Sequence, residues 1–191
     1  MEKKDIGAKN FWYPMPITLV GANVNGKPNY LTIAFCGMVN LRPPAISVAL
    51  NKAHYTNSGI RENKTFSVNI PSAEMAKITD YCGLVSGSKV DKSKLFETFY
   101  GKLKTAPMIR ECPLNLECKL VQTLEFSVDE VFVGEIIAAY AEERYLTNGL
   151  PDIKKINPIV FSMHDNNYWK VGDLVGRAWN IGKKFKSKEG E

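Results

Sequence analysis

The sequence predicts a mainly β protein, a barrel with a few short helices. Apolar runs rich in β-branched and aromatic residues dominate the 191 residues, and clusters of turn residues separate them. Hydrophobic content of 45% and charged content of 24% are ordinary for a globular chain. A chain of this length can bury a sizeable core, so we expect one domain over 1–191.

The predicted strands share a high content of branched and aromatic residues. They cover Ile17–Val24, Tyr30–Phe35, Ile46–Leu50, Phe66–Ile70, Leu114–Phe126, Val131–Ala141 and Ile159–Met163. Asn25-Gly26 lies between the first two strands and is typical of a hairpin turn. Arg42-Pro43-Pro44 cannot continue a ladder of hydrogen bonds, so we expect a connector between strands there.

Helix-start signals are few. Ser72 can cap a helix over Ala73–Tyr81, and Ser93 can cap a second one from Lys94 to about Tyr100. The segment from about 72 to 108 therefore reads as a helical and loop excursion out of the barrel. Excursions of this length usually serve a function.

A phosphate site is predicted where the strand ending at Leu50 meets the next helix. Thr56, Asn57 and Ser58 offer N-cap oxygens to a short helix that runs towards Asn63, and the free amides of such a helix attract phosphate. The small residues of a second loop, Thr32–Gly37, would let a planar ligand approach the backbone closely. Together the two loops favour flavin mononucleotide (FMN) as the cofactor.

Several other classes of function are disfavoured. The net charge of +5 owes much to the basic C-terminal tail, Lys183–Lys188, which is typical of a solvated end and not of a nucleic-acid site. No signal peptide or membrane-spanning run is found, so we expect a cytoplasmic protein. The four cysteines contain no Cys-x-x-Cys pair, which disfavours a metal site. The two histidines lie in no Ser-His-acid pattern, and no dinucleotide-binding glycine motif is present.

A series of short motifs resembles one known family, and the resemblance covers nearly the whole chain. The motifs are Tyr13–Pro16, Leu19–Ala22, Thr32–Gly37, Pro43-Pro44, His54–Thr56, Phe66–Pro71, Asp80–Gly83, Ser86-Gly87, Asp91–Ser93, Glu111–Pro113 and Tyr168–Gly172. In this order they resemble the flavin reductase-like, FMN-binding split-barrel family, and within it the flavoredoxin branch.

The resemblance implies a homodimer of six-stranded Greek-key split β-barrels, with one FMN per subunit near the dimer interface. It implies that the polar edge of the flavin ring meets backbone groups of Thr32, Ile33, Ala34, Phe35 and Gly37. It also implies that the ribityl chain and phosphate meet Asn51, Lys52, His54, Tyr55 and Thr56. The same cleft would be lined by Asn69, Pro71, Cys82, Ser86 and Lys92.

Simpler roles stay open for several of these residues. Thr56 can be a helix cap only, and His54 can be a turn residue bonded to the backbone. Cys82 can be a buried small side chain, and Lys92 a solvated one. At position 54 many members of the broader family carry arginine. A neutral imidazole offers one donor where a guanidinium offers two, so phosphate binding could depend on pH.

The resemblance leaves the function open between two classes. The first is an NAD(P)H-dependent flavin reductase or related oxidoreductase, in which the flavin supplies the reactivity. The second is a non-enzymatic FMN electron carrier that docks redox proteins. A flavin-binding protein without redox turnover is a third interpretation.

Overall fold

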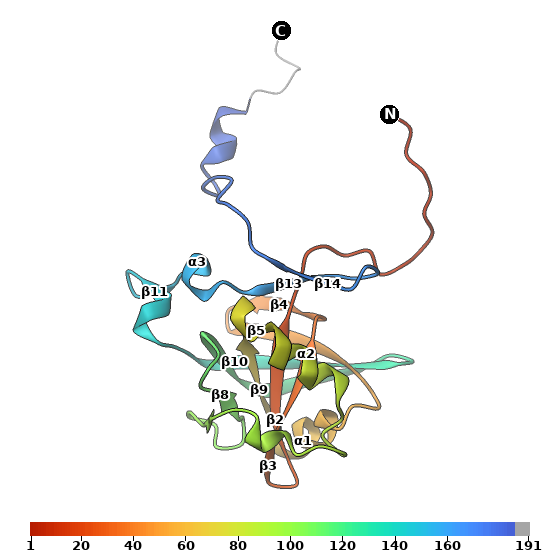
Figure 1. Ribbon diagram of the computed structural model, residues 1–191, viewed down its shortest axis with the longest axis vertical. Coiled ribbons are helices and arrows are strands. Elements are labelled where there is room, and N and C mark those ends of the chain that lie inside the picture. The colour runs from red at the N-terminus through yellow and green to blue at the C-terminus, as the bar shows by residue number, and fades with distance from the viewer. Residues whose placement is uncertain (186–191) are drawn as a thin grey trace.

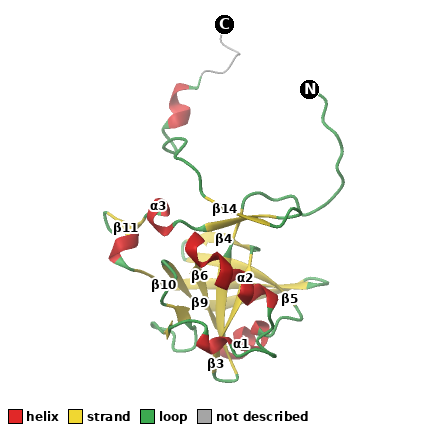
Figure 2. Cartoon of the chain, viewed as in Figure 1, coloured by secondary structure: helices red, strands yellow, loops and turns green. Residues whose placement is uncertain are grey.

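A computed structural model describes residues 1–185. The predicted basic tail falls outside the described residues from Lys186 onward. The first residues of the chain and the described residues after β14 leave the body on the same side as two arms (Figure 1). The remaining residues form a β-rich body with short helices on its outside (Figure 2). No helix within 1–185 has the length and apolar character that crossing a membrane requires.

The main sheet has seven antiparallel strands in the order β3-β2-β6-β9-β10-β5-β4. The strands are β2 (Thr18–Val24), β3 (Lys27–Ile33), β4 (Cys36–Leu41), β5 (Pro44–Asn51), β6 (Thr65–Ile70), β9 (Leu114–Glu125) and β10 (Asp129–Ala141). Strands β3 and β4 are the two edges of this sheet, yet only Ala34 and Phe35 separate them along the chain. The sheet must therefore curl until its edges meet. This is a barrel whose last seam is not hydrogen-bonded, and the predicted split barrel is confirmed.

The strand count differs slightly from the predicted six because β4 was not anticipated. Its residues after Cys36 are all exposed, so the strand lacks the alternation that marks a half-buried strand. The predicted loop Thr32–Gly37 shrinks accordingly to the link Ala34-Phe35. The connector at Arg42-Pro43-Pro44 is the tight turn between β4 and β5, with Pro44 already in β5.

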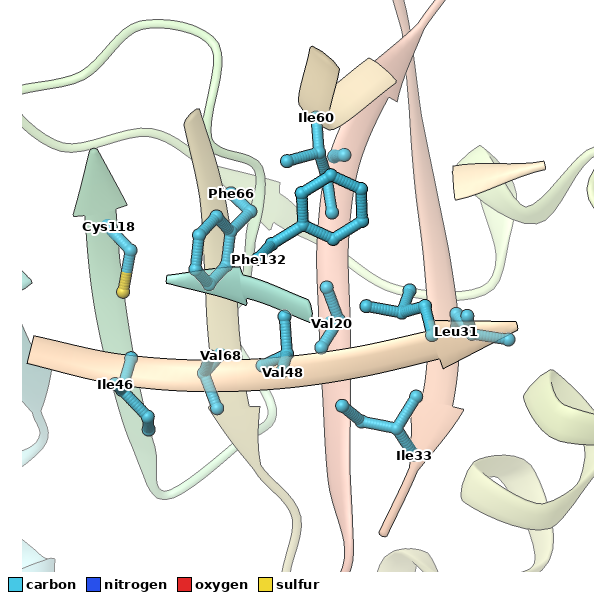
Figure 3. Packing of buried hydrophobic residues seen from close by; sticks show 12 residues of the cluster. Val20, Leu31, Ile33, Ile46, Val48, Ile60, Phe66, Val68, Cys118 and Phe132 are labelled. Atoms are coloured by element: carbon cyan, nitrogen blue, oxygen red, sulfur yellow. The ribbon is translucent and has the colours of Figure 1, made fainter. Parts of the chain in front are cut away.

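The barrel interior is filled by alternate residues of the strands. Val20, Val48, Phe66 and Phe132 are each fully buried and converge in one cluster (Figure 3). Ile60 of helix α1 (Thr56–Asn63) closes one end of this cluster. Because interiors of this kind are packed as densely as organic crystals, the strand ends that carry polar residues are held rigidly.

The remaining elements lie outside the barrel. They are β1 (Met15–Pro16), η1 (Ala73–Met75), α2 (Ala76–Leu84), η2 (Lys92–Lys94), β7 (Thr98–Phe99), β8 (Met108–Ile109), η3 (Glu143–Tyr145), β11 (Leu146–Thr147), β12 (Leu150–Pro151), α3 (Ile153–Ile156), β13 (Ile159–Ser162), β14 (Asn167–Lys170) and η4 (Ile181–Lys184). The helix predicted after Ser72 is found as η1 followed by α2, although the Ser72 side chain makes no capping hydrogen bond.

The helix predicted over Lys94–Tyr100 is wrong. Asp91, not Ser93, begins a single 3₁₀ turn, because its carboxylate accepts hydrogen bonds from the amide and the hydroxyl of Ser93. The chain then extends, and Thr98–Phe99 pairs with Met108–Ile109. Tertiary pairing has overridden the local helix signal at this position.

The excursion is tied back to the barrel by a buried carboxylate. Glu117 of β9 is fully buried and accepts hydrogen bonds from the amides of Lys102 (2.9 Å) and Leu103 (2.6 Å) and from the Tyr140 hydroxyl (3.2 Å). Gly101 is required beside it, since a Cβ there would lie 2.2 Å from the Tyr140 hydroxyl oxygen. The carboxylate therefore fixes the loop that returns the excursion to the sheet.

Replacing Glu117 should lower the free energy of unfolding. Glu117→Ala leaves the part-buried amides of Lys102 and Leu103 without acceptors, and an unpaired donor away from water costs about 1–3 kcal/mol. We expect a loss of roughly 2–5 kcal/mol, measured from the urea midpoint at constant slope. Glu125→Gln is the matched control, because Glu125 lies on the same strand with its side chain 71% exposed. A variant Glu117→Ala as stable as this control would contradict the assignment.

Candidate functional site

Two cavities lie near opposite ends of β3. The first, the Trp12 cavity, has a volume of about 480 Å³. It is lined by the β3–β4 link and its surroundings: Asn10, Trp12, Met15, Ala34, Phe35, Cys36 and Asp129. Half-buried small groups and an exposed aromatic side chain make its wall suitable for a flat apolar ligand.

The second, the Lys92 cavity, has a volume of about 350 Å³ and a polar wall. It lies between the β2–β3 hairpin, Tyr55 and the loop Gly87–Lys92. Gly87 permits the close approach of that loop, since a Cβ there would lie 2.0 Å from Oδ1 of Asn29. The Asn25 amide fixes the Tyr55 ring by a 3.1 Å hydrogen bond to its hydroxyl.

Lys92 is a buried cation without a counter-ion. Its residue is only 2% exposed, and Nζ donates to the carbonyls of Tyr30 (2.9 Å) and Cys82 (2.7 Å). None of the ion pairs among residues 1–185 includes it. Desolvation lowers the pKa of this ammonium group. Lysine is seldom buried unless it is paired, so the site favours an anion beside it.

The start of α1 offers further donors. Tyr55 occupies the N-cap position and no side chain caps the helix, so the predicted capping by Thr56, Asn57 or Ser58 is wrong. The amides of Tyr55 and Thr56 donate no hydrogen bond within the described part of the chain. Free amides at a helix start are suited to an anion.

The Thr56 side chain itself is already engaged. Its residue is 1% exposed, and its hydroxyl oxygen accepts a 2.8 Å hydrogen bond from the Asn29 amide. The oxygen therefore joins helix α1 to β3. A hydroxyl that accepts one hydrogen bond keeps its own proton to donate, so the Thr56 hydroxyl and the free backbone amides beside it both stay candidate donors for an anion.

The pKa of His54 is affected by one charged residue from each cavity. The imidazole pKa is lowered, first by desolvation and then by the positive charge of Lys92, while the carboxylate of Asp129 opposes the shift. Lys92 lines one cavity and Asp129 lines the other. Along β3, Asn29 and Ala34 are five residues apart, roughly 16 Å at about 3.3 Å per residue. An elongated ligand with an anionic end and a flat end fits this spacing.

The other predicted site residues are spread between these cavities and the interior. Asn51 ends β5 and its Oδ1 accepts from the amide of Ala53, which shapes the turn that carries Lys52 and His54. Ser86 is exposed and bonded to Ser88 at 2.8 Å. Gly37 lies in the exposed strand β4.

Four predicted residues are packed or hydrogen-bonded within the fold. Ile33 packs into the barrel core, and Pro71 is buried. Thr32 donates its hydroxyl proton to the Thr79 carbonyl, which ties α2 to the edge of β3. Asn69 is fully buried: it donates to the Leu19 carbonyl (2.8 Å) and accepts from the Ile109 amide (3.1 Å). The side chains of these residues serve the fold and are not free for a ligand.

The thiols near the cavities are protonated at neutral pH. Burial raises the pKa of Cys36 to about 11, against a smaller lowering by a hydrogen bond with Thr18. Burial also raises the pKa of Cys82 to about 11, although the charge of Lys92 lowers it in part. Cys82 is fully buried, as its simpler interpretation expects. Neither thiol is a ready nucleophile.

Two cavity residues escaped the sequence analysis. Asn29 sits in what reads as a hairpin turn, and Asp129 begins a strand just after another turn. Polar residues in turns are usually solvated, so neither position carried a signal of its own. Asp129 could have been flagged only by its position opposite Asn51 in the sheet.

Comparisons with known proteins identify the family of this chain. Residues 10–161 match the flavin reductase like domain family. The structure of flavoredoxin from Methanosarcina acetivorans is 60% identical with a TM-score of 0.94, over 96% of this chain and 98% of that chain. Flavoredoxin of Desulfovibrio vulgaris (Miyazaki F) is 35% identical with a TM-score of 0.89, over 95% of this chain and 100% of that chain.

More distant relatives extend the comparison. An uncharacterized protein of Archaeoglobus fulgidus is 32% identical over 155 residues, 80% of this chain and 86% of that protein. The FMN reductase (NADH) RutF of Acinetobacter baylyi is 24% identical over 120 residues, 60% of either chain. The family match spans most of the barrel, including both edge strands and the turn before α1. This chain therefore belongs to the flavin reductase-like family of FMN-binding split-barrel proteins.

Proposed function

We propose that the chain binds one FMN per subunit and transfers electrons or hydride through it, with NAD(P)H as donor. The phosphate would lie in the Lys92 cavity and the flavin ring in the Trp12 cavity. The observation that carries the proposal is the buried Lys92 ammonium, which has carbonyl partners only. A phosphate beside it would provide the missing negative charge and accept its third N–H.

The residues around this site fit the cofactor in chemistry as well as in charge. The free amides at the start of α1 extend the set of donors for a phosphate, whereas the predicted contact Lys52 is paired with Glu125 at 3.4 Å. Asn51, at the end of β5, stands between the two cavities together with His54. When bound, FMN would supply the redox chemistry, while the protein supplies orientation and electrostatics. No acid–base constellation is then required of the side chains.

A homodimer is part of this proposal. Strand β4 and the two arms carry large apolar side chains in water: Leu41 is 81% exposed, Val175 91% and Trp179 95%. Exposed apolar surface on this scale marks an interface more often than a free surface, and two-fold dimers are the commonest solution. Light scattering on the FMN-loaded protein should give about twice the 21.4 kDa of one chain.

The alternative is an electron carrier that docks redox proteins, the class that the flavoredoxin names of the two similar structures favour. The name of the Acinetobacter relative favours a nicotinamide-dependent reductase instead. Anaerobic mixing of the FMN-loaded protein with NADH or NADPH separates the two. Rapid bleaching of the flavin band supports the reductase, and its absence supports the carrier.

Removing the charge of Lys92 should weaken FMN binding but not riboflavin binding. A hydrogen bond to a charged group is worth about 1.5–3 kcal/mol, so Lys92→Met should raise the Kd for FMN roughly 10- to 150-fold. Riboflavin lacks the phosphate, and its Kd should change little. Fluorescence quenching of both ligands measures this.

Lys94→Met is the matched control for this experiment. Lys94 belongs to the same 3₁₀ turn as Lys92 but is exposed. Equal losses of FMN and riboflavin in Lys92→Met would show a general disturbance of the site, and the proposed phosphate seat would then be refuted. An unchanged Kd for FMN would refute it as well.

The contribution of His54 should depend on pH. Its pKa is lowered in the free protein by desolvation and by the charge of Lys92, so the imidazole gains its charge below the ordinary value of about 6.5. A nearby phosphate would favour the charged form, so by linkage the anion binds more tightly as pH falls. We expect the ratio of the Kd values of His54→Asn and wild type to be near 1 at about pH 8 and severalfold higher at about pH 5.5.

The ratio of the two proteins cancels the titration of the FMN phosphate itself, because both are measured at the same pH. Without ligand the sign is reversed. The unfolded imidazole binds its proton more readily than the folded one, so His54 contributes stability at high pH that is lost as pH falls through the folded pKa. A Kd ratio that does not vary with pH would place His54 away from the phosphate.

A further inference from the structure

The carboxylate of Asp129 belongs to the wall of the Trp12 cavity. Asp129 is the first residue of β10 and lines the cavity together with Ala34 and Phe35. Its neighbour Glu130 turns the other way, is 3% exposed, and accepts hydrogen bonds from Asn57 and Arg61 of α1. Because side chains alternate along a strand, Asp129 lies on the outer face of the sheet.

This carboxylate has no partner of its own. Among the described residues its side chain takes part in no hydrogen bond and no ion pair, although the residue is half-buried. The nearest lysine in the sheet register, Lys52, is paired with Glu125 at 3.4 Å instead. Half-buried polar groups usually find partners. The negative charge therefore faces the cavity uncompensated, and its effect on His54 shows that it acts over this region.

We propose that Asp129 sets the reduction potential of a redox ring bound in the Trp12 cavity by holding a negative charge against it. This inference rests on the proposed function, because it assigns the ring to that cavity. A hydride from a nicotinamide adds two electrons and one proton, so the bound ring gains one negative charge unless water supplies a second proton. A fixed carboxylate nearby disfavours that added charge.

The negative charge of Asp129 should lower the reduction potential of the bound ring. The carboxylate weakens binding of the reduced cofactor relative to the oxidised one, which lowers the potential and makes the reduced protein a stronger donor. A protein that passes electrons to a partner benefits from this sign. Asp129 touches the ring cavity but takes no proton or electron, so it is a tuning residue and not an acid–base group.

The test is the potential of the FMN-loaded full-length protein with Asp129→Asn. Asparagine keeps the shape, and the Asp129 carbonyl still accepts its hydrogen bond from the Phe126 amide, with Asp129 opposite Asn51 in the sheet register. The potential is measured by equilibration with a reference dye at fixed pH. We expect the affinity for reduced over oxidised FMN to rise about tenfold, equivalent to an upward shift of about 30 mV for a two-electron couple.

Glu125→Gln is the control, since it removes the same charge from the same hairpin at an exposed position. Its potential should stay within a twofold change in relative affinity, because water screens exposed charges. Asp129→Ser is a second variant and should shift the potential in the same direction as Asp129→Asn. Equal potentials for wild type, Asp129→Asn and Asp129→Ser would overturn the inference, as would an equal shift in Glu125→Gln.

The outcome also separates this inference from the proposed function. If wild type binds no FMN, both the proposed function and this inference are refuted. If wild type binds FMN and both Asp129 variants keep its potential, the proposed function stands and only the role of Asp129 falls.

Discussion

The unbonded seam of the barrel is the constraint from which the site follows. Two residues, Ala34 and Phe35, join the two edge strands, so the sheet closes in space but not in hydrogen bonds. An edge strand presents unpaired backbone groups that have to be satisfied in some other way. The excursion does so along β3: Lys92 takes the Tyr30 carbonyl, and α2 is joined to the same strand through Thr32. The two cavities lie near opposite ends of β3, and the excursion lines the one at Lys92.

The positions of the charges in the site follow from that arrangement. A loop that satisfies a buried carbonyl with an ammonium group brings an unpaired positive charge to one end of β3. At the other end, the first residue of β10 contributes an unpaired negative charge on the outer face. His54 lies in the turn between them and responds to both. The two opposite charges do not pair with each other among the described residues. An elongated ligand bound across both cavities would have its anionic end beside Lys92 and its other end beside Asp129.

Local pattern was enough to predict most of the barrel, and tertiary contacts account for what it missed. Strands such as Phe66–Ile70 carry β-branched and aromatic residues that pack into the core, and this composition made them predictable from sequence. Strand β4 pairs with β5, but its residues after Cys36 are all exposed, so it lacks the alternation of a half-buried strand and reads as a loop. The helix after Ser93 failed because Thr98–Phe99 found a partner strand ten residues away. Local propensity is a weak prior wherever pairing of this kind is available.

The candidate site shows the same division. The turn before α1 could be recognised from sequence, because a strand end followed by hydroxyl and amide residues signals a helix start. The Thr56 hydroxyl oxygen accepts a hydrogen bond from Asn29, 27 positions away. This contact depends on how β3 passes α1, so no local sequence pattern could predict it. Lys92 could be read as a solvated lysine until its burial was known. The site therefore consists of polar groups that the fold leaves without partners. Such a group can be recognised only when the hydrogen bonds and ion pairs of its neighbours are known.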